Sequence, residues 1–233
     1  MVIDKDFKDL EKKLKVTFVD QKLLINSCVH RSYLNEHPGF YLEHNERLEF
    51  LGDAVLELVV TDHLYRQHPD KSEGELTNWR ASLVNANILS DIARGLGIED
   101  FLLLSKGEEK DKNSKARHFI LANAMEAVIG AIYLDQGLEV ADMFIEENVL
   151  SHLPHILKHK LYLDPKTRLQ EAAQEHLGIT PIYQVLEESG PDHAKVFKVA
   201  VYFNDEMIAV GEGTSKQEAQ VAAAENACVA KEW

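Results

Sequence analysis

Four carboxylates recur at helical spacing in one stretch of this 233-residue chain. They are Glu46, Glu49, Asp53 and Glu57, and on an α-helix they would fall within an arc of about 80°. Apolar residues are expected to occupy the opposite, core-facing side of the same helix: Leu48, Leu51, Val55 and Leu58. Such a column of carboxylates either forms a solvated face or holds a divalent cation, and the spacing alone leaves both interpretations open.

A second segment, 119–133, within a helix predicted at 116–134, is apolar nearly all round and is expected to be buried. Asn123 and Glu126 are its strongly polar members before Tyr133, and they lie three residues apart on one face. Because an unpaired buried carboxylate is costly, Glu126 needs a partner, and a hard cation between the two helices would satisfy both sets of oxygens. A di-iron bundle would require Glu-x-x-His pairs, and the chain contains none.

Composition limits the possible classes of protein. Twelve Gly and six Pro exclude collagen-like and low-complexity chains, and two Cys exclude a disulfide scaffold or zinc ribbon. We see neither a secretion signal nor an apolar run long enough to span a membrane, so we expect a soluble, cytoplasmic protein. A net charge of −14 disfavours nucleic acid as a partner, so any such assignment must rest on local patterns.

Helical periods dominate the first 160 residues. They predict helices at 4–14, 20–28, 43–67, 73–96, 116–134 and 138–150. Ser72 and Glu75 form a predicted capping box, and Gly95 and Gly97 would end the helix that follows it. The segment 106–117 is polar and is expected to be a loop.

The pattern changes after residue 160. A helix at Lys166–Leu177 is followed by three predicted strands, at 182–188, 197–203 and 207–210, and by an Ala-rich helix at 215–230. The order α-β-β-β-α indicates a small α+β domain. We therefore predict an all-helical domain over residues 1–160 and an α-β-β-β-α domain over residues 161–233.

The stretch Asn45-Glu-Arg-Leu-Glu-Phe-Leu-Gly-Asp-Ala-Val-Leu56 resembles the signature of the ribonuclease III family. The resemblance extends to His30-Arg-Ser-Tyr33 with Asn35-Glu36, to Glu73-Gly-Glu-Leu with Arg80-Ala-Ser-Leu-Val84, and to 120–135. The second domain is similar to a double-stranded-RNA-binding domain through 164–171, 211–216 and the Ala-rich end. Together these motifs cover nearly the whole chain.

The resemblance implies a homodimeric endonuclease of double-stranded RNA that uses Mg²⁺, which Mn²⁺ can replace. The implied products carry 5′-phosphate and 3′-hydroxyl ends with short 3′ overhangs, and the implied substrates are structured precursors such as rRNA and mRNA. Glu49, Asp53 and Glu126 match metal positions, and Asp53 and Glu126 match active-site positions. Glu46 and Glu73 match further acidic positions near the scissile strand.

Asn123 departs from the family pattern, which usually has Asp at this position. Its carbonyl oxygen can still ligate a hard cation, with one negative charge fewer. It is either a natural variant that still binds metal, an engineered or evolved weakening, or the mark of a double-stranded-RNA-binding protein that does not cleave. Retention of the other five acidic positions argues against the last interpretation.

The second domain is acidic, with six basic and twelve acidic residues from Tyr162 onward. Recognition of A-form RNA relies on shape, 2′-hydroxyls and a few phosphate contacts, so a basic domain is not required. The resemblance assigns RNA contacts to Thr167, Gln170, Glu171, His193, Ser215 and Lys216. Gln217 and Glu218 stand where the family often has basic residues, which predicts weaker binding with a shallower salt dependence.

Three further positions carry structural expectations. Glu57 lies on the carboxylate column but outside the family's set, and is expected to pair with Arg47 or another base. Gly52 and Gly130 are expected to permit close helix packing. Phe50 is expected to contact a second subunit.

Overall fold

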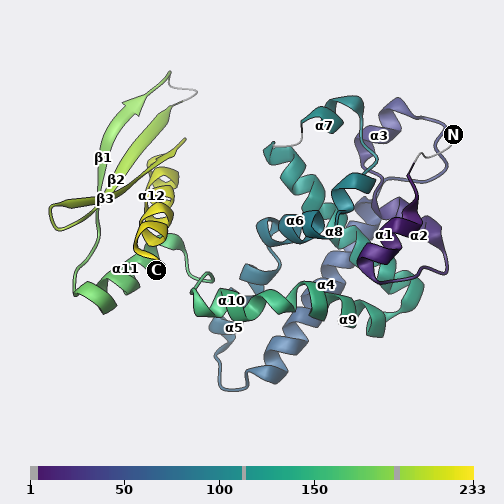
Figure 1. Cartoon of the computed structure of the whole chain (residues 1–233), viewed down its shortest axis with the longest axis horizontal. Helices are drawn as coiled ribbons and strands as arrows, with labels where there is room; N and C mark the ends of the chain where they lie inside the picture. Colours follow the sequence, from purple (N-terminus) through teal and green to yellow (C-terminus); the bar gives the residue numbers. More distant parts are fainter. Residues whose placement is uncertain (1–4, 112–113, 192–194) are drawn as a thin grey trace. The chain divides into compact units, whose positions relative to one another are not determined.

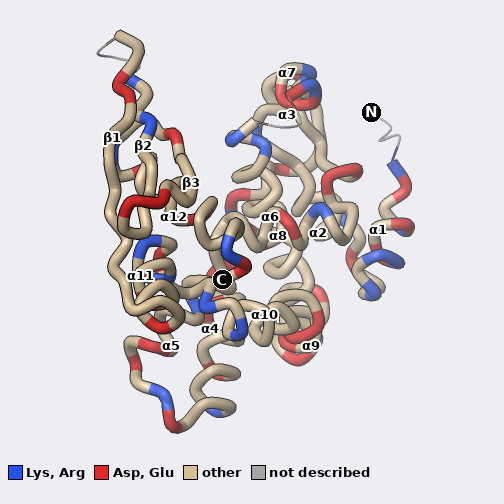
Figure 2. Tube along the Cα trace, turned by 60° about the vertical axis from the view of Figure 1, so that its left-hand side comes forward, with Lys and Arg blue, Asp and Glu red and all other residues tan. Residues whose placement is uncertain are grey.

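The computed structural model describes residues 5–111, 114–191 and 195–233, in two compact units (Figure 1). The first unit ends at Pro154 and the second begins at His155, slightly before the predicted boundary at 160/161. Acidic positions outnumber basic ones along both units (Figure 2). The helix α10 (Leu153–Lys158) runs across this division.

The first unit is all-helical in its described residues, as predicted. Its helices are α1 (Phe7–Leu14), α2 (Gln21–Ser27), α3 (Arg31–Glu36), α4 (Glu46–Gln67), α5 (Glu73–Leu83), α6 (Ala86–Gly95), α7 (Lys106–Lys110), α8 (Lys115–Gln136) and α9 (Leu138–Asn148), with the short 3₁₀ turns η1 (Ile98–Phe101) and η2 (Leu150–His152). The capping box of Ser72 and Glu75 starts α5, as predicted.

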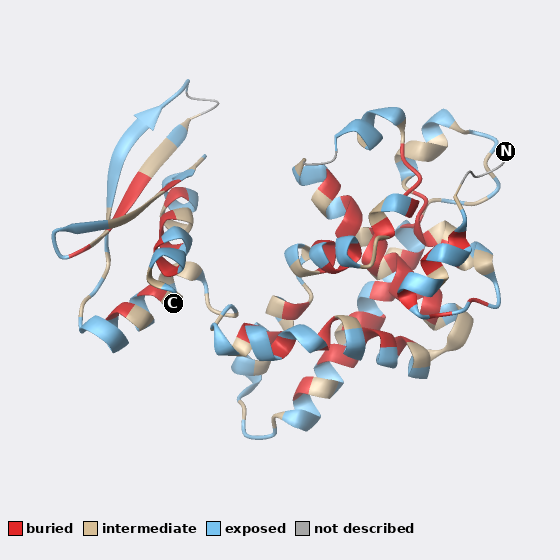
Figure 3. Ribbon diagram, in the orientation of Figure 1, coloured by how far each residue is buried: buried red, intermediate tan, exposed pale blue. Residues whose placement is uncertain are grey.

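Helix α8 forms the centre of this unit, and buried positions follow most of its length (Figure 3). By length and composition alone it could cross a membrane, but most of its apolar stretch is buried inside the unit, as in the core helix of a globular protein. Helix α4 packs against it at unusually short range. A Cβ atom placed on Gly52 would lie 1.8 Å from the backbone oxygen of Glu126, and one on Gly130 would lie 2.3 Å from that of Leu48. These glycines therefore permit close helix packing, as expected.

Several predicted boundaries were wrong. The single helix predicted at 73–96 is broken after Leu83, because the Asn85 side chain accepts hydrogen bonds from the backbone N–H groups of Asn87 and Ile88 and caps α6. The predicted loop at 106–117 contains α7 and the start of α8, each with a serine N-cap. Helix α3 was not predicted, and the His30 side chain caps its first turn.

The predicted core face of α4 also needs correction. Leu58 was placed on that face, but 57% of its surface is exposed. Gly52, Leu56 and Val60 are buried instead, so the buried face lies beside the carboxylate column rather than opposite to it. The flank of the column that carries Glu49 is consequently turned partly into the protein.

The second unit has the predicted α-β-β-β-α order. Helix α11 (Pro165–Leu177) precedes strands β1 (Ile182–Ser189), β2 (Val196–Phe203) and β3 (Glu206–Gly213), and α12 (Lys216–Lys231) ends the unit. The sheet is antiparallel in the order β1-β2-β3. Both helices pack on one core with residues of β2: Leu169, Ala173, Val201, Phe203, Ala223, Ala224, Ala227 and Cys228.

The third strand is longer than the predicted 207–210, because β3 pairs with β2 from Glu206 to Gly213. Asn204 has a φ of 53° and makes the tight turn between the two strands, as its side chain type allows. Part of the turn predicted at 189–193, including His193, lies outside the described residues.

Candidate active site and RNA-binding surface

The carboxylates of α4 and α8 face one another across the close contact between the two helices. Glu49 and Glu126 are half-buried, and Asp53 is exposed. The Asn123 side chain donates a hydrogen bond to the Glu49 carboxylate, which lowers the pKa of Glu49 against the larger opposing effects. The structure thus brings together the four residues predicted to bind metal, two from each helix.

Burial and the negative charges nearby raise the pKa values of two members of this cluster, Glu126 and Glu49. Desolvation, followed by the charges of Asp53 and Glu49, raises the pKa of Glu126 from 4.5 to about 8. Desolvation, followed by the charge of Glu46, raises the pKa of Glu49 as well. Within the described part of the chain, Glu49, Asp53 and Glu126 have no ion pair with a Lys, Arg or His. This cluster would therefore gain from a bound cation.

The two other carboxylates of the column are compensated by nearby bases. Glu46 lies 3.8 Å from Arg31 and 3.6 Å from the ring of His44. Glu57 lies 3.9 Å from Arg80, whereas Arg47 pairs with Glu43 instead, so the expected base is Arg80 and not Arg47. The column is thus divided into a compensated and an uncompensated part.

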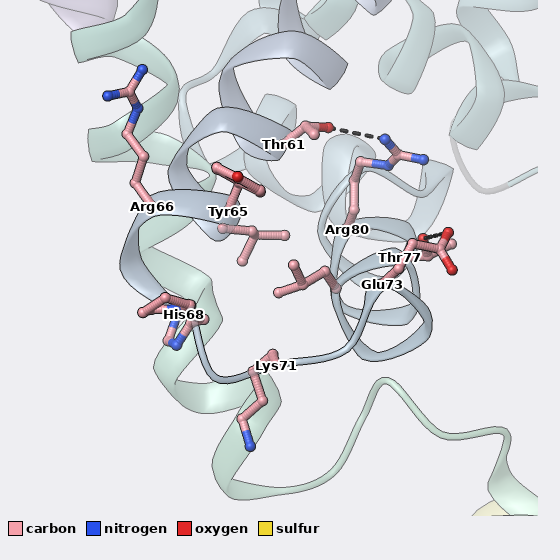
Figure 4. A pocket seen from close by; sticks show the side chains of 11 residues that line it. Thr61, Tyr65, Arg66, His68, Lys71, Glu73, Thr77 and Arg80 are labelled. Atoms are coloured by element: carbon pink, nitrogen blue, oxygen red, sulfur yellow. Dashed lines mark hydrogen bonds between the residues drawn. The ribbon is translucent and has the colours of Figure 1, made fainter.

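Glu73 is not brought to this cluster. It is exposed at the first residue of α5, where its carboxylate accepts a hydrogen bond from the Thr77 hydroxyl at 3.2 Å. Figure 4 shows both residues beside a cavity of about 620 Å³, which is lined by residues from the end of α4 to α5. The predicted role of Glu73 near the scissile strand stays a prediction.

The donor set fits a hard cation in its chemistry. Carboxylate oxygens with an amide carbonyl are the ligands that Mg²⁺ and similar ions prefer. In the described residues, no three His, Cys, Asp or Glu side chains converge closely enough to form a ready-made metal centre. The fit therefore rests on the type of the four side chains and on the raised pKa values of Glu49 and Glu126.

Five of the six predicted RNA-binding residues lie on the surface of the second unit, and the sixth, His193, lies outside the described residues. Thr167, Gln170 and Glu171 are exposed on α11, and Ser215 and Lys216 are exposed at the start of α12. The Ser215 hydroxyl caps α12 by accepting from the backbone N–H of Glu218 at 3.1 Å. Thr167 donates its hydroxyl proton to Asp164, the N-cap of α11.

Two of these residues already hold a partner within the chain. Lys216 pairs with Glu188 of β1 at 2.6 Å, and Glu171 pairs with Lys160 at 3.6 Å. Sequence reasoning missed Glu188 and Lys160 as neighbours of the surface. The basic character of 155–160 was a signal for Lys160, whereas the proximity of Glu188 to Lys216 depends on strand register and helix docking.

Comparison with known proteins places this arrangement in a class. Residues 20–153 match the family described as ribonuclease-III-like, and residues 165–229 match the double-stranded RNA binding motif. A helical nuclease domain followed by a module of this second type defines an endoribonuclease that cleaves double-stranded RNA.

Similar proteins give the same result. Ribonuclease 3 of Protochlamydia amoebophila is 45% identical over 94% of this chain and 89% of its own length. Ribonuclease 3 of Carboxydothermus hydrogenoformans is 46% identical over 94% of this chain and 92% of its own length. The chain belongs to the ribonuclease III family, which is metal-dependent.

Solved structures of the nuclease domain of ribonuclease III from Campylobacter jejuni are also similar. One is 39% identical, covers 64% of this chain and 97% of its own, and has a TM-score of 0.57. Another, described as flexible in a region involved in dimer formation, is 41% identical with a TM-score of 0.55, covering 61% of this chain and 98% of its own.

Proposed function

We propose that this chain cleaves double-stranded RNA with Mg²⁺ held between α4 and α8, leaving 5′-phosphate and 3′-hydroxyl ends. The observation that carries the proposal is Glu126: a half-buried carboxylate, with a pKa of about 8, that faces Asp53 and Glu49 and has no basic partner among the described residues. A partly buried carboxylate beside other negative charges is stabilised in its ionised form when a hard cation binds to it.

Glu49, Asp53 and Glu126, with the carbonyl oxygen of Asn123, would hold the ion. When bound, Mg²⁺ supplies a water nucleophile at neutral pH and a positive charge opposite the developing charge of the phosphodiester. Asp53 is the exposed member, so it is the carboxylate best placed to orient that water. Glu126 is held by the buried helix α8, which fixes its position and excludes bulk solvent on one side.

A gel assay with long, fully paired RNA tests the proposal. Fragments are expected in Mg²⁺ and not in EDTA, and the new 5′ ends should accept no further phosphate until a phosphatase has acted on them. A retarded but intact duplex in Mg²⁺ would instead mean that the chain binds without cutting, as expected if Asn123 had disabled the site. Replacing Mg²⁺ with Mn²⁺ should sustain cutting, because both are hard cations.

We also infer a homodimer, with the exposed apolar side chains of α4 as the contact. Phe50, Leu58 and Tyr65 are 81%, 57% and 72% exposed, and their spacing places them on one side of that helix. The cavity in Figure 4 has Leu64, Tyr65 and Leu76 in its lining and could receive an aromatic side chain of a second copy. A twofold axis would bring each Phe50 to the partner's surface.

Sedimentation of Phe50→Asp tests the dimer. A charge at this position should shift the species to the mass of one chain, whereas Val229→Asp should leave it unchanged. Val229 is a fair control because it is 76% exposed and lies on α12 in the other unit. Dimers that persist in Phe50→Asp would place the contact elsewhere.

The natural substrates that we propose are structured precursors of rRNA and mRNA, processed in the cytoplasm. Both cysteines are free and buried, which suits a reducing compartment.

A further inference from the structure

In the second unit, a carboxylate of the chain itself occupies a lysine that is predicted to bind an RNA phosphate. Lys216, the first residue of α12, lies over the ring of Phe197 at 5.6 Å and reaches Glu188 on the neighbouring strand. Glu188 and Phe197 are register partners across β1 and β2, so the carboxylate sits where the lysine chain ends. The ion pair is short, at 2.6 Å, and it lowers the pKa of Glu188.

A carboxylate and a phosphate are alternative anions for one ammonium group. Both partners remain partly exposed, at 56% for the Lys216 side chain and 41% for that of Glu188, so RNA could reach the lysine without unfolding anything. Binding would then exchange one anion for another and leave Glu188 exposed next to a polyanion. Both effects reduce the gain from the phosphate contact.

We propose that Glu188 sets the RNA affinity of this unit by occupying Lys216 in place of an RNA phosphate. The inference rests on the proposed assignment of Lys216 to the RNA surface. It names a residue that determines affinity and that touches no RNA itself. The consequence is a lower affinity for duplex RNA, because the Lys216 ammonium group must leave Glu188 before it can bind a phosphate.

The chain offers a matched control for the test. Lys198 and Glu212 form a second ion pair at 3.2 Å, between neighbouring strands β2 and β3, and neither residue is predicted to bind RNA. Glu188→Gln and Glu212→Gln therefore change net charge equally, and each removes one Lys–Glu pair whose glutamate lies on a strand of the same sheet. Only the first variant frees a lysine that belongs to the predicted RNA surface.

The experiment measures binding of the full chain to a short RNA duplex in EDTA, over a range of salt concentrations. Glu188→Gln should bind the duplex about three- to tenfold more tightly, because Lys216 no longer has to leave a carboxylate. The gain is limited to this range because an exposed ion pair contributes little free energy. The slope of log binding constant against log salt concentration should steepen by the equivalent of about one further phosphate contact at most. Glu212→Gln should match the unmodified chain, and Lys216→Ala should bind more weakly.

A double-mutant cycle decides whether the effect passes through Lys216. The gain from Glu188→Gln should vanish when Lys216 is already alanine. A gain that persists there, or an equal gain in Glu212→Gln, would show that net charge alone is responsible and would overturn the proposal. Unchanged binding by Glu188→Gln would overturn it as well. If the unmodified chain did not bind the duplex, the proposed function would fail instead.

Discussion

The two units of this acidic chain treat their charges in opposite ways. Between α4 and α8, burial and neighbouring negative charges raise the pKa values of Glu49 and Glu126, and neither these two residues nor Asp53 has a basic partner within the described residues. In the second unit, Lys198 and Lys216 each pair with a glutamate. The unpaired carboxylates of the first unit attract a cation, and the Lys–Glu pairs of the second unit weaken its attraction for RNA phosphates. A net charge of −14 is therefore compatible with an RNA substrate, because the local arrangement of charges decides what each unit attracts.

Removing the central carboxylate should have the largest effect. Glu126→Gln keeps the shape of the side chain but removes the charge that faces Asp53, so Mg²⁺-supported cleavage should fall by about a thousandfold. Initial rates on a long RNA duplex measure the loss, with the helical circular-dichroism signal of the full chain as the check on folding. Glu57→Gln is the control, since Glu57 is compensated by Arg80 and should keep its rate within about threefold. Normal cutting by Glu126→Gln would show that the site is assigned wrongly.

Separating the two helices should break the cluster by another route. Gly52→Ala places a Cβ atom against the backbone of Glu126, which must move away, so unfolding in urea should show a loss of about 3 kcal/mol or more. Gly74→Ala is the matched control, because a Cβ atom there meets nothing within 4 Å. If both variants were equally stable, the close packing of α4 on α8 would be refuted.

The pH dependence of stability should report the repulsion directly. Since the pKa of Glu126 is raised to about 8, the folded chain retains a proton that the unfolded chain releases near 4.5, and stability falls as the pH rises between these values. Without metal, Glu126→Gln should remove this cost and be more stable than the unmodified chain by about 1–2 kcal/mol above pH 8, after a discount for partial exposure. The difference should disappear below about pH 4. Urea unfolding at several pH values in EDTA provides the measurement, and equal stability of both chains at pH 9 would contradict it.

The smallest effect is expected at Asn123. Its amide keeps an oxygen for the cation and already donates to Glu49, so Asn123→Asp should change Mg²⁺-supported cleavage by less than about threefold. Rates measured over a series of Mg²⁺ concentrations would test this. A gain of a hundredfold or more would mean that Asn123 had weakened the site.

The carboxylate column shows how far sequence patterns lead. Helical spacing was sufficient to predict that Glu49 and Asp53 share a face and that Glu126 needs a partner, because both inferences depend on local geometry and the cost of burial. It misplaced Leu58, since the side of α4 that is buried depends on where α8 docks.

The missed elements have equally specific causes. The break before Asn85 depends on a side chain that competes with the backbone, and the apolar period continues across it. Glu188 and Lys216 are 28 positions apart in the sequence, and strand pairing with helix docking alone brings them together. Contacts of this type leave no local pattern in the sequence.

Synthesis from the N-terminus separates the two halves of the carboxylate cluster in time. Asp53 leaves the ribosome well before Glu126, and α4 cannot bury its apolar side until α8, which ends at Gln136, has emerged. A growing chain therefore carries no complete carboxylate cluster during the first half of its translation. The proposed cation site can therefore form only late in synthesis, after α8 has left the ribosome and can dock against α4.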